Sequence, residues 1–76
     1  MKPSKNSKDL LKIFGQSIRK QREAKGWTLE DTELHGWTNW RHLQLIETGK
    51  KNISFLTLAN IARLYKISLS ELLKEI

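Results

Sequence analysis

The stretch that decides the fold is Gly26–Gly49, GWTLEDTELHGWTNWRHLQLIETG, which holds two short helical patterns on either side of a glycine. The first pattern predicts a helix over about residues 29–34. Thr28 is its expected N-cap, and Asp31 is placed three residues on to reach back as in a capping box, where Glu or Gln is the usual partner. Gly36 is expected to end this helix because glycine tolerates the backbone of a tight turn.

The second pattern predicts a helix over about residues 40–47. Thr38 or Asn39 offers its N-cap, and Gly49 is the expected C-terminal glycine. Two helices joined by a short turn that contains glycine form the outline of a helix-turn-helix. Many helical hairpins share this outline, so the rest of the chain has to support it.

Length and composition favour one small all-helical domain. The chain has 76 residues and no cysteine, which excludes a disulfide framework and a thiolate metal site. Its formal net charge of +6 favours a polyanionic partner. No apolar run approaches the roughly 20 residues that span a membrane, and no apolar segment typical of a signal peptide follows the N-terminal lysines. We therefore expect a cytoplasmic protein.

The positive charge flanks the central stretch. Residues 1–25 carry a net charge of +6, residues 26–47 a net charge of −3, and residues 48–76 a net charge of +3. This distribution fits a protein whose flanking elements contact phosphates while its centre reads bases. Lysines that merely face solvent are the alternative explanation.

The N-terminal third predicts an arm and a helix. Residues 1–7 are polar and aperiodic, so we interpret them as a flexible arm, or else as a disordered tail, ahead of a domain over residues 8–76. A helix should start near Lys8, with Ser7 as its N-cap, and end before Gly26. Its expected core residues are Leu11, Phe14 and Ile18, its outward residues are Arg19, Lys20 and Lys25, and the following Trp27 is expected in the core.

Two further helices are expected after a basic loop. Ser54 and Ser68 are their N-caps, and each is bracketed by an apolar pair that can form a hydrophobic staple, Ile53 with Leu58 and Ile67 with Leu72. The first of these helices presents Phe55, Leu58, Ala59, Ala62 and Tyr65 at core spacing, and the second presents Leu69, Leu72, Leu73 and Ile76. Five short helices therefore account for the chain.

The spacing over residues 14–73 resembles the phage-repressor-like helix-turn-helix family of Cro and lambda-repressor type, also called the XRE family. The resemblance covers about four-fifths of the chain. It implies a five-helix DNA-binding fold and a transcriptional regulator of double-stranded DNA. The residues that carry it are Ile18-Arg19-Lys20-Gln21-Arg22, Lys25-Gly26-Trp27-Thr28, Leu43, Ile46-Glu47, Gly49, Lys51-Asn52-Ile53-Ser54-Phe55, Thr57-Leu58, Ile61-Ala62 and Ile67-Ser68-Leu69-Ser70-Glu71-Leu72-Leu73.

The resemblance assigns the second helix of the motif to the DNA major groove. The residues expected at base edges are Asn39, Trp40, Arg41, Gln44 and Leu45. Among them, Arg41 can donate two hydrogen bonds to guanine and Gln44 can pair with adenine in a similar way. The residues expected at phosphates are Arg19, Arg22, Thr28, His42, Lys50, Lys51 and Asn52. The same resemblance pairs Arg22 with Glu47 across two helices, although two unrelated surface charges are the alternative.

Several residues depart from the family pattern. Leu29 stands where a phosphate-contacting Gln is usual, and Thr32 and Glu33 replace an apolar Leu-Ala pair. We expect Leu34 to supply the missing apolar contact through a changed rotation of its helix. Lys66 replaces the usual Gly after the fourth helix, where a left-handed non-Gly residue is uncommon.

The aromatic residues and histidines of the motif allow more than one role. Trp37 is expected to cover the turn or join the core. For Trp40 we weigh a contact with thymine methyls against a packing role, and favour packing. His35 and His42 lack the further ligands that a metal site needs, so no metal and no cofactor are expected.

Three functions compete. A sequence-specific DNA-binding regulator, of the small repressor or controller kind, fits the basic flanks and the motif spacing. A protein-interaction module on the same scaffold, such as an antitoxin, is the alternative, favoured by acidic residues in the first motif helix and by exposed Leu29 and Leu45. An enzyme is not expected, because no catalytic constellation is present.

The apolar stripe of the last helix is a core face and a candidate homodimer surface. No place for a small-molecule ligand is evident.

Overall fold

The computed structural model describes residues 7–74, and these form five helices and no strand. The helices are α1 (Ser7–Ala24), α2 (Asp31–Leu34), α3 (Trp40–Glu47), α4 (Phe55–Tyr65) and α5 (Leu69–Leu73). The predicted all-α, five-helix architecture is therefore confirmed. Most of the predicted N-terminal arm, and Ile76 at the other end, lie outside the described residues. No described helix is long and apolar enough to cross a membrane.

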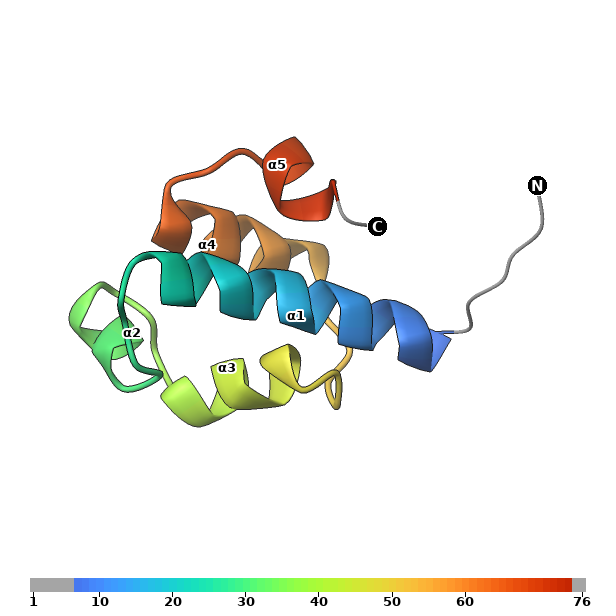
Figure 1. The fold of residues 1–76 in the computed structure, drawn as a ribbon, viewed down its shortest axis with the longest axis horizontal. Coiled ribbons are helices and arrows are strands. Elements are labelled where there is room, and N and C mark those ends of the chain that lie inside the picture. Colours follow the sequence, from blue (N-terminus) through green and yellow to red (C-terminus); the bar gives the residue numbers. More distant parts are fainter. Residues whose placement is uncertain (1–6, 75–76) are drawn as a thin grey trace.

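The longest helix, α1, lies at the centre of the arrangement, with α3 along one side and α4 and α5 along the other (Figure 1). The short α2 lies beyond the C-terminal end of α1 and leads directly into α3 (Figure 1). Contacts of α1 with both α3 and α5 confirm this central position. The motif helices thus rest on a framework made by the other three.

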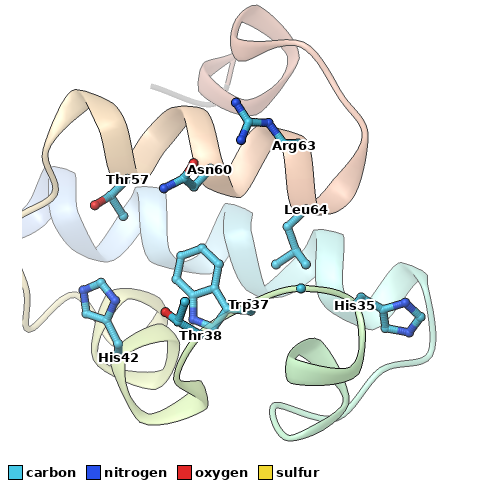
Figure 2. A pocket seen from close by; sticks show the side chains of 9 residues that line it. His35, Trp37, Thr38, His42, Thr57, Asn60, Arg63 and Leu64 are labelled. Atoms are coloured by element: carbon cyan, nitrogen blue, oxygen red, sulfur yellow. The ribbon is translucent and has the colours of Figure 1, made fainter.

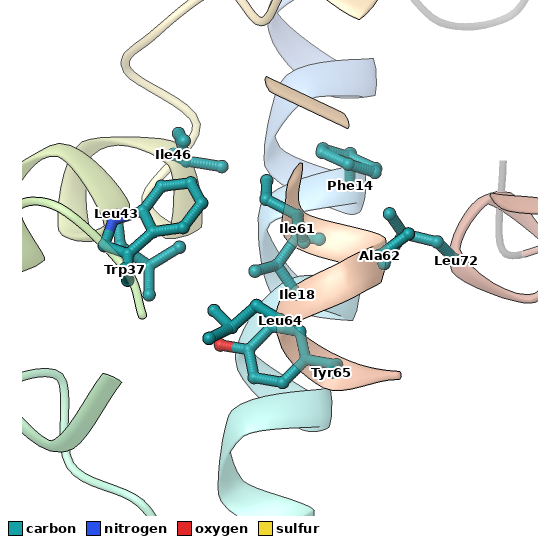
Figure 3. Close-up of a cluster of buried hydrophobic side chains, with 10 residues drawn as sticks. All are labelled: Phe14, Ile18, Trp37, Leu43, Ile46, Ile61, Ala62, Leu64, Tyr65 and Leu72. Atoms are coloured by element: carbon teal, nitrogen blue, oxygen red, sulfur yellow. The ribbon is translucent and has the colours of Figure 1, made fainter. Parts of the chain in front are cut away.

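The core collects apolar side chains from every side of this framework (Figure 3). Ile18, Leu43, Ile61 and Leu72 are each completely buried, and they come from four different helices. The remaining buried apolar residues are Phe14, Trp37, Ile46, Ala62, Leu64 and Tyr65. Because burial of each such side chain contributes roughly 1.5–3 kcal/mol, this shared core fixes α3 against α1 and α4.

A glycine sets the close approach of α1 to α3. Gly15 is buried in the middle of α1, and a Cβ atom there would lie 2.5 Å from the carbonyl oxygen of Ile46. No larger residue fits without moving one helix, so Gly15 is required for packing although it weakens the helix that contains it.

The helix caps follow the local sequence closely. The hydroxyl oxygens of Ser54 and Ser68 accept hydrogen bonds from the amides of Thr57 and Glu71, both at 3.1 Å, so both predicted N-caps are confirmed. Lys66 ends α4 in the left-handed conformation, with φ 57° and ψ 44°. α1 begins at Ser7, so the residue predicted as its cap is already helical.

Several sequence predictions of burial are corrected by the fold. Phe55, predicted in the core, is the first residue of α4 and is 71% exposed. Leu73 is also partly exposed, at the edge of α5. Trp27 is half-buried and packs against the core, and so does Leu29, which was predicted to be exposed.

Candidate nucleic-acid interface

The N-terminus of α3 is capped from two directions. Asn39 has an extended backbone, and its Oδ1 accepts a hydrogen bond from the amide of Arg41 at 2.9 Å. The carboxylate of Glu33, at the end of α2, accepts a hydrogen bond from the amide of Trp40 at 2.8 Å. Asn39 is therefore the N-cap, as one of the two predicted candidates, and the start of α3 is tied to α2 as well as to its own loop.

The C-terminus of α3 closes in a Schellman motif. Gly49 has φ 74°, its amide donates to the carbonyl oxygen of Ile46 at 3.1 Å, and the amide of Lys50 donates to that of Leu45 at 2.9 Å. This pair of hydrogen bonds satisfies carbonyl groups that the helix itself leaves free. The predicted glycine stop is confirmed, and it fixes where the basic loop after α3 begins.

The two faces of α3 divide as the sequence predicted. Leu43 and Ile46 are buried in the core, whereas Arg41, Gln44 and Leu45 are exposed on the outer face. The faces differ because apolar residues three apart lie on one side of a helix. The outer face is therefore free to meet a ligand.

Trp40 and Arg41 lie together at the start of that outer face. The guanidinium carbon of Arg41 is 5.4 Å from the centre of the Trp40 ring, within the range of a cation–π interaction. Trp40 itself is half-buried. The indole therefore restricts the conformations of Arg41 while it leaves the guanidinium accessible.

A buried ion pair joins α1 to the end of α3. The Nε and Nη2 atoms of Arg22 donate to the two carboxylate oxygens of Glu47 at 2.8 and 2.9 Å, and Nη1 donates to the carbonyl oxygen of Trp27 at 2.8 Å. The side chains of the pair are 11% and 5% exposed. The hydrogen bonds to Glu47 raise the pKa of Arg22. The predicted structural pair is confirmed, and all three guanidinium nitrogens of Arg22 already donate to the protein.

α2 is shorter than predicted, and its N-cap residue is Glu30, which makes no side-chain capping hydrogen bond, so Thr28 is not the N-cap although its predicted exchange with Asp31 is formed. The amide of Asp31 donates to the Thr28 hydroxyl oxygen at 3.1 Å, and the Asp31 carboxylate accepts from the Thr28 amide at 2.9 Å, which is a reciprocal capping box. The helix then has a single turn. Thr32 is buried and satisfies its hydroxyl on the carbonyl of Leu29, whereas Leu34 is 81% exposed. The prediction that Leu34 supplies an apolar contact is therefore wrong.

The turn between α2 and α3 depends on glycine and tryptophan. Gly36 has φ 105°, a conformation that other residues rarely adopt. Trp37 is buried, as predicted, and its Nε1 donates to the carbonyl oxygen of Asn39 at 2.9 Å. His42 of α3 faces the Trp37 ring at 5.9 Å, so the turn and the helix hold each other.

His35 has an aromatic partner. Its ring stacks on Trp27 with centroids 3.8 Å apart and an interplanar angle of 8°. Within residues 7–74, no group of three or more His, Asp or Glu side chains is placed to hold a metal ion.

The residues predicted at phosphates lie on α1, ahead of α2, on α3 and in the loop that follows α3. Arg19 is exposed and paired with Glu23 at 2.9 Å, one turn along α1. Thr28 is exposed ahead of α2, and His42 is half-buried on α3. Lys50, Lys51 and Asn52 are all exposed in the loop that follows α3. Arg22 alone among the predicted residues is buried.

Sequence reasoning missed two residues that position this surface. The Glu33 carboxylate caps α3 across the turn, and Gly15 lets α3 approach α1. Neither has a local signal: the cap joins residues seven apart, and the glycine reads as an unfavourable residue within a helix. The capping partner follows only from the three-dimensional turn.

Together, the fold and the orientation of α3 define a helix-turn-helix domain of five helices. Residues 18–72 match the sequence model of the helix-turn-helix family HTH_3, which is of XRE type, and the chain belongs to this family.

The chain also has similar relatives of known structure or sequence. It is 30% identical over 64 residues to the uncharacterised HTH-type transcriptional regulator y4dJ of Sinorhizobium fredii, a match that covers 84% of this chain and 83% of the relative. The restriction-modification controller protein C.AhdI from Aeromonas hydrophila superposes with a TM-score of 0.73 at 31% identity, over 84% of this chain and 96% of that one. The clp gene regulator ClgR from C. glutamicum superposes with a TM-score of 0.77 at 27% identity, over 87% of this chain and 86% of that one.

The family match and these relatives establish which class of protein the chain belongs to. The protein is a DNA-binding transcriptional regulator whose partner is double-stranded DNA, and its family and structural neighbours are regulators of this kind instead of enzymes. Of the two functions that competed most closely on the sequence, the comparisons favour the regulator over the interaction module.

Proposed function

We propose that this protein recognises a specific operator by placing α3 in the major groove of DNA, as a small repressor or controller protein. The observation that carries the proposal is the outer face of α3, where Arg41 and Gln44 are exposed on a helix fixed at both ends. Arg41 donates to guanine O6 and N7, and Gln44 pairs with adenine N6 and N7. Asn39, Trp40 and Leu45 complete the base-contacting set.

Phosphate contacts surround this helix in the proposed complex. Lys50, Lys51 and Asn52 follow α3, while Thr28 precedes α2 and Arg19 projects from α1. Such contacts set the register of the protein on the duplex without reading sequence. His42, half-buried on α3, completes the set. Arg22 has a different role in this proposal, because its donors hold Glu47 and the recognition helix in place.

Two copies of the chain bind the operator in our proposal. Leu10 is 40% and Leu73 36% exposed, and both line an apolar groove of about 310 Å³ where α1, α4 and α5 meet. Burial of this groove against a second copy would remove exposed apolar surface from water. Sedimentation should show a dimer that Leu73→Glu converts to a monomer of unchanged helix content. A wild-type monomer at operator-saturating concentrations would contradict the dimer.

Selection of bound sequences from a random duplex pool, at roughly physiological salt, tests the whole proposal. A palindromic consensus with half-site centres about 10 bp apart is expected, because two recognition helices enter successive major grooves on one side of the duplex. If no sequence is enriched although the protein is folded, base reading by α3 is refuted.

A further inference from the structure

A cleft opens between the helix-turn-helix turn and α4 (Figure 2). Its volume is about 440 Å³, which is within the range of sites that hold small molecules. Trp37 and His42 line it on the turn side, and Thr57, Asn60, Arg63 and Leu64 line it on the α4 side. The turn side of the cleft thus belongs to the helix-turn-helix that we propose to read DNA, whereas the α4 side does not.

Two buried apolar residues of the core, Trp37 and Leu64, line the inner part of the cleft. In Figure 2, the indole of Trp37 points toward α4, and the side chain of Leu64 extends from α4 toward the turn beside it. Both residues are buried, at 9% and 8% exposure, and the Trp37 ring is held by its hydrogen bond to the carbonyl of Asn39. The His42 ring lies nearly parallel to the indole, at an interplanar angle of 13°. A planar ring would find a preorganised surface here.

The α4 rim of the cleft carries unused donors, Arg63 and Asn60, and in Figure 2 the Arg63 guanidinium lies on the side of α4 away from Trp37. The guanidinium of Arg63 and the amide of Asn60 are exposed on α4, and neither has a hydrogen-bond or ion-pair partner among the described residues. No Asp or Glu belongs to the described lining of the cleft. By contrast, Arg19 is paired with a glutamate. A guanidinium with no internal acceptor favours a carboxylate, which it binds through two parallel hydrogen bonds.

We propose that this cleft binds a small, flat carboxylate, such as an aromatic or heteroaromatic acid. The ring lies against Trp37 and Leu64, and the carboxylate accepts hydrogen bonds from Arg63 and Asn60. The sequence offered no evident place for a small-molecule ligand, because the lining residues come together only when α4 packs over the turn. A bound acid would touch His42 of α3, so its relevance to DNA reading rests on the proposed function.

Binding can be measured on the full chain without DNA. ¹H–¹⁵N spectra are recorded during titration with benzoate and quinoline-2-carboxylate, and separately with their uncharged amides and with inorganic phosphate. The carboxylates should shift the indole N–H of Trp37 and the side-chain amide of Asn60, with at least tenfold tighter binding than the amides. Arg63→Gln should weaken carboxylate binding at least fivefold. Lys20→Gln, which removes an equal charge from an exposed position on α1, should leave it unchanged.

Three results would overturn the inference. One is the absence of shifts in the cleft at millimolar carboxylate, and another is equal binding of acid and amide. The third is inorganic phosphate binding as tightly as the aromatic acids, which would indicate a contact for the DNA backbone. Each spectrum also reports whether the variant is folded. Because no DNA is present, failure here is separate from failure of operator recognition.

Discussion

The ion pair between Arg22 and Glu47 offers the sharpest test of how α3 is held. Glu47→Gln keeps the size of the side chain and removes its charge. The guanidinium of Arg22 would then remain 11% exposed with only neutral acceptors, the carbonyl of Trp27 and the one amide oxygen of the introduced side chain, whose NH2 group would face a guanidinium donor. A buried charge that loses its partner is costly, because neither water nor an opposite charge replaces the lost interaction.

The expected loss is a large part of the total stability. Removal of one partner of a buried pair costs about 3–5 kcal/mol, and the isosteric change should fall near the lower figure. A domain of this length has a free energy of unfolding of roughly 4–11 kcal/mol, at about 0.05–0.15 kcal/mol per residue. The variant should therefore remain folded only marginally, with α3 displaced first.

Urea unfolding followed by circular dichroism measures this loss, and α1 provides a matched control. Glu23→Gln breaks the pair with Arg19, whose side chains are 62% and 53% exposed, so it should cost less than about 0.5 kcal/mol. The double variant Arg22→Leu/Glu47→Leu should recover much of the lost stability, since no buried charge is left alone. Equal midpoints for Glu47→Gln and Glu23→Gln would refute the assigned role of the buried pair.

Three further changes test other parts of the fold. Gly15→Ala should lower the free energy of unfolding by about 1–3 kcal/mol despite its better helix propensity, because its Cβ would lie 2.5 Å from the Ile46 carbonyl oxygen; an unchanged urea midpoint would contradict this packing. Burial raises the pKa of the Tyr65 hydroxyl far above its usual value, so folding stability should fall as pH rises past about 10, by up to about 1.4 kcal/mol per pH unit. Tyr65→Phe should remove that part of the slope and cost nothing near neutral pH, because the hydroxyl has no hydrogen-bond partner; parallel alkaline profiles for the two proteins would refute the assignment. Glu33→Ala should cost about 1 kcal/mol by freeing the Trp40 amide at the start of α3, and amide exchange at Trp40 should accelerate; an unchanged exchange rate would show that the cap is not formed in solution.

The sequence predicted α3 well because the interactions at its two ends join residues that are close in the chain. The bounds of α3 were predicted from an N-cap and a C-terminal glycine, and both interactions are formed within a few residues. The Arg22–Glu47 pair followed from the family resemblance instead, because its partners are 25 residues apart. Neither periodicity nor capping would have found it.

Helical spacing failed where burial depends on what lies opposite. Phe55 has core spacing but is exposed, because spacing groups residues on one face of α4 without showing which of them another element covers. Leu34 is exposed because the single turn of α2 has too few residues for a continuous apolar stripe. The cleft over the turn arises in the same way, from the packing of α4 against residues that no local pattern links to it.

The most direct test of base reading is the effect of Arg41→Ala on affinity for a selected operator and for a random duplex of equal length. Lys51→Ala, in the loop after α3, is the matched control for loss of charge. Arg41→Ala should weaken operator binding roughly 5- to 150-fold, the equivalent of about 1–3 kcal/mol, and weaken random-duplex binding far less. Lys51→Ala should weaken both duplexes by a similar factor. Equal losses on both duplexes for Arg41→Ala would mean that the residue contacts only phosphate, and the proposed reading helix would be wrong.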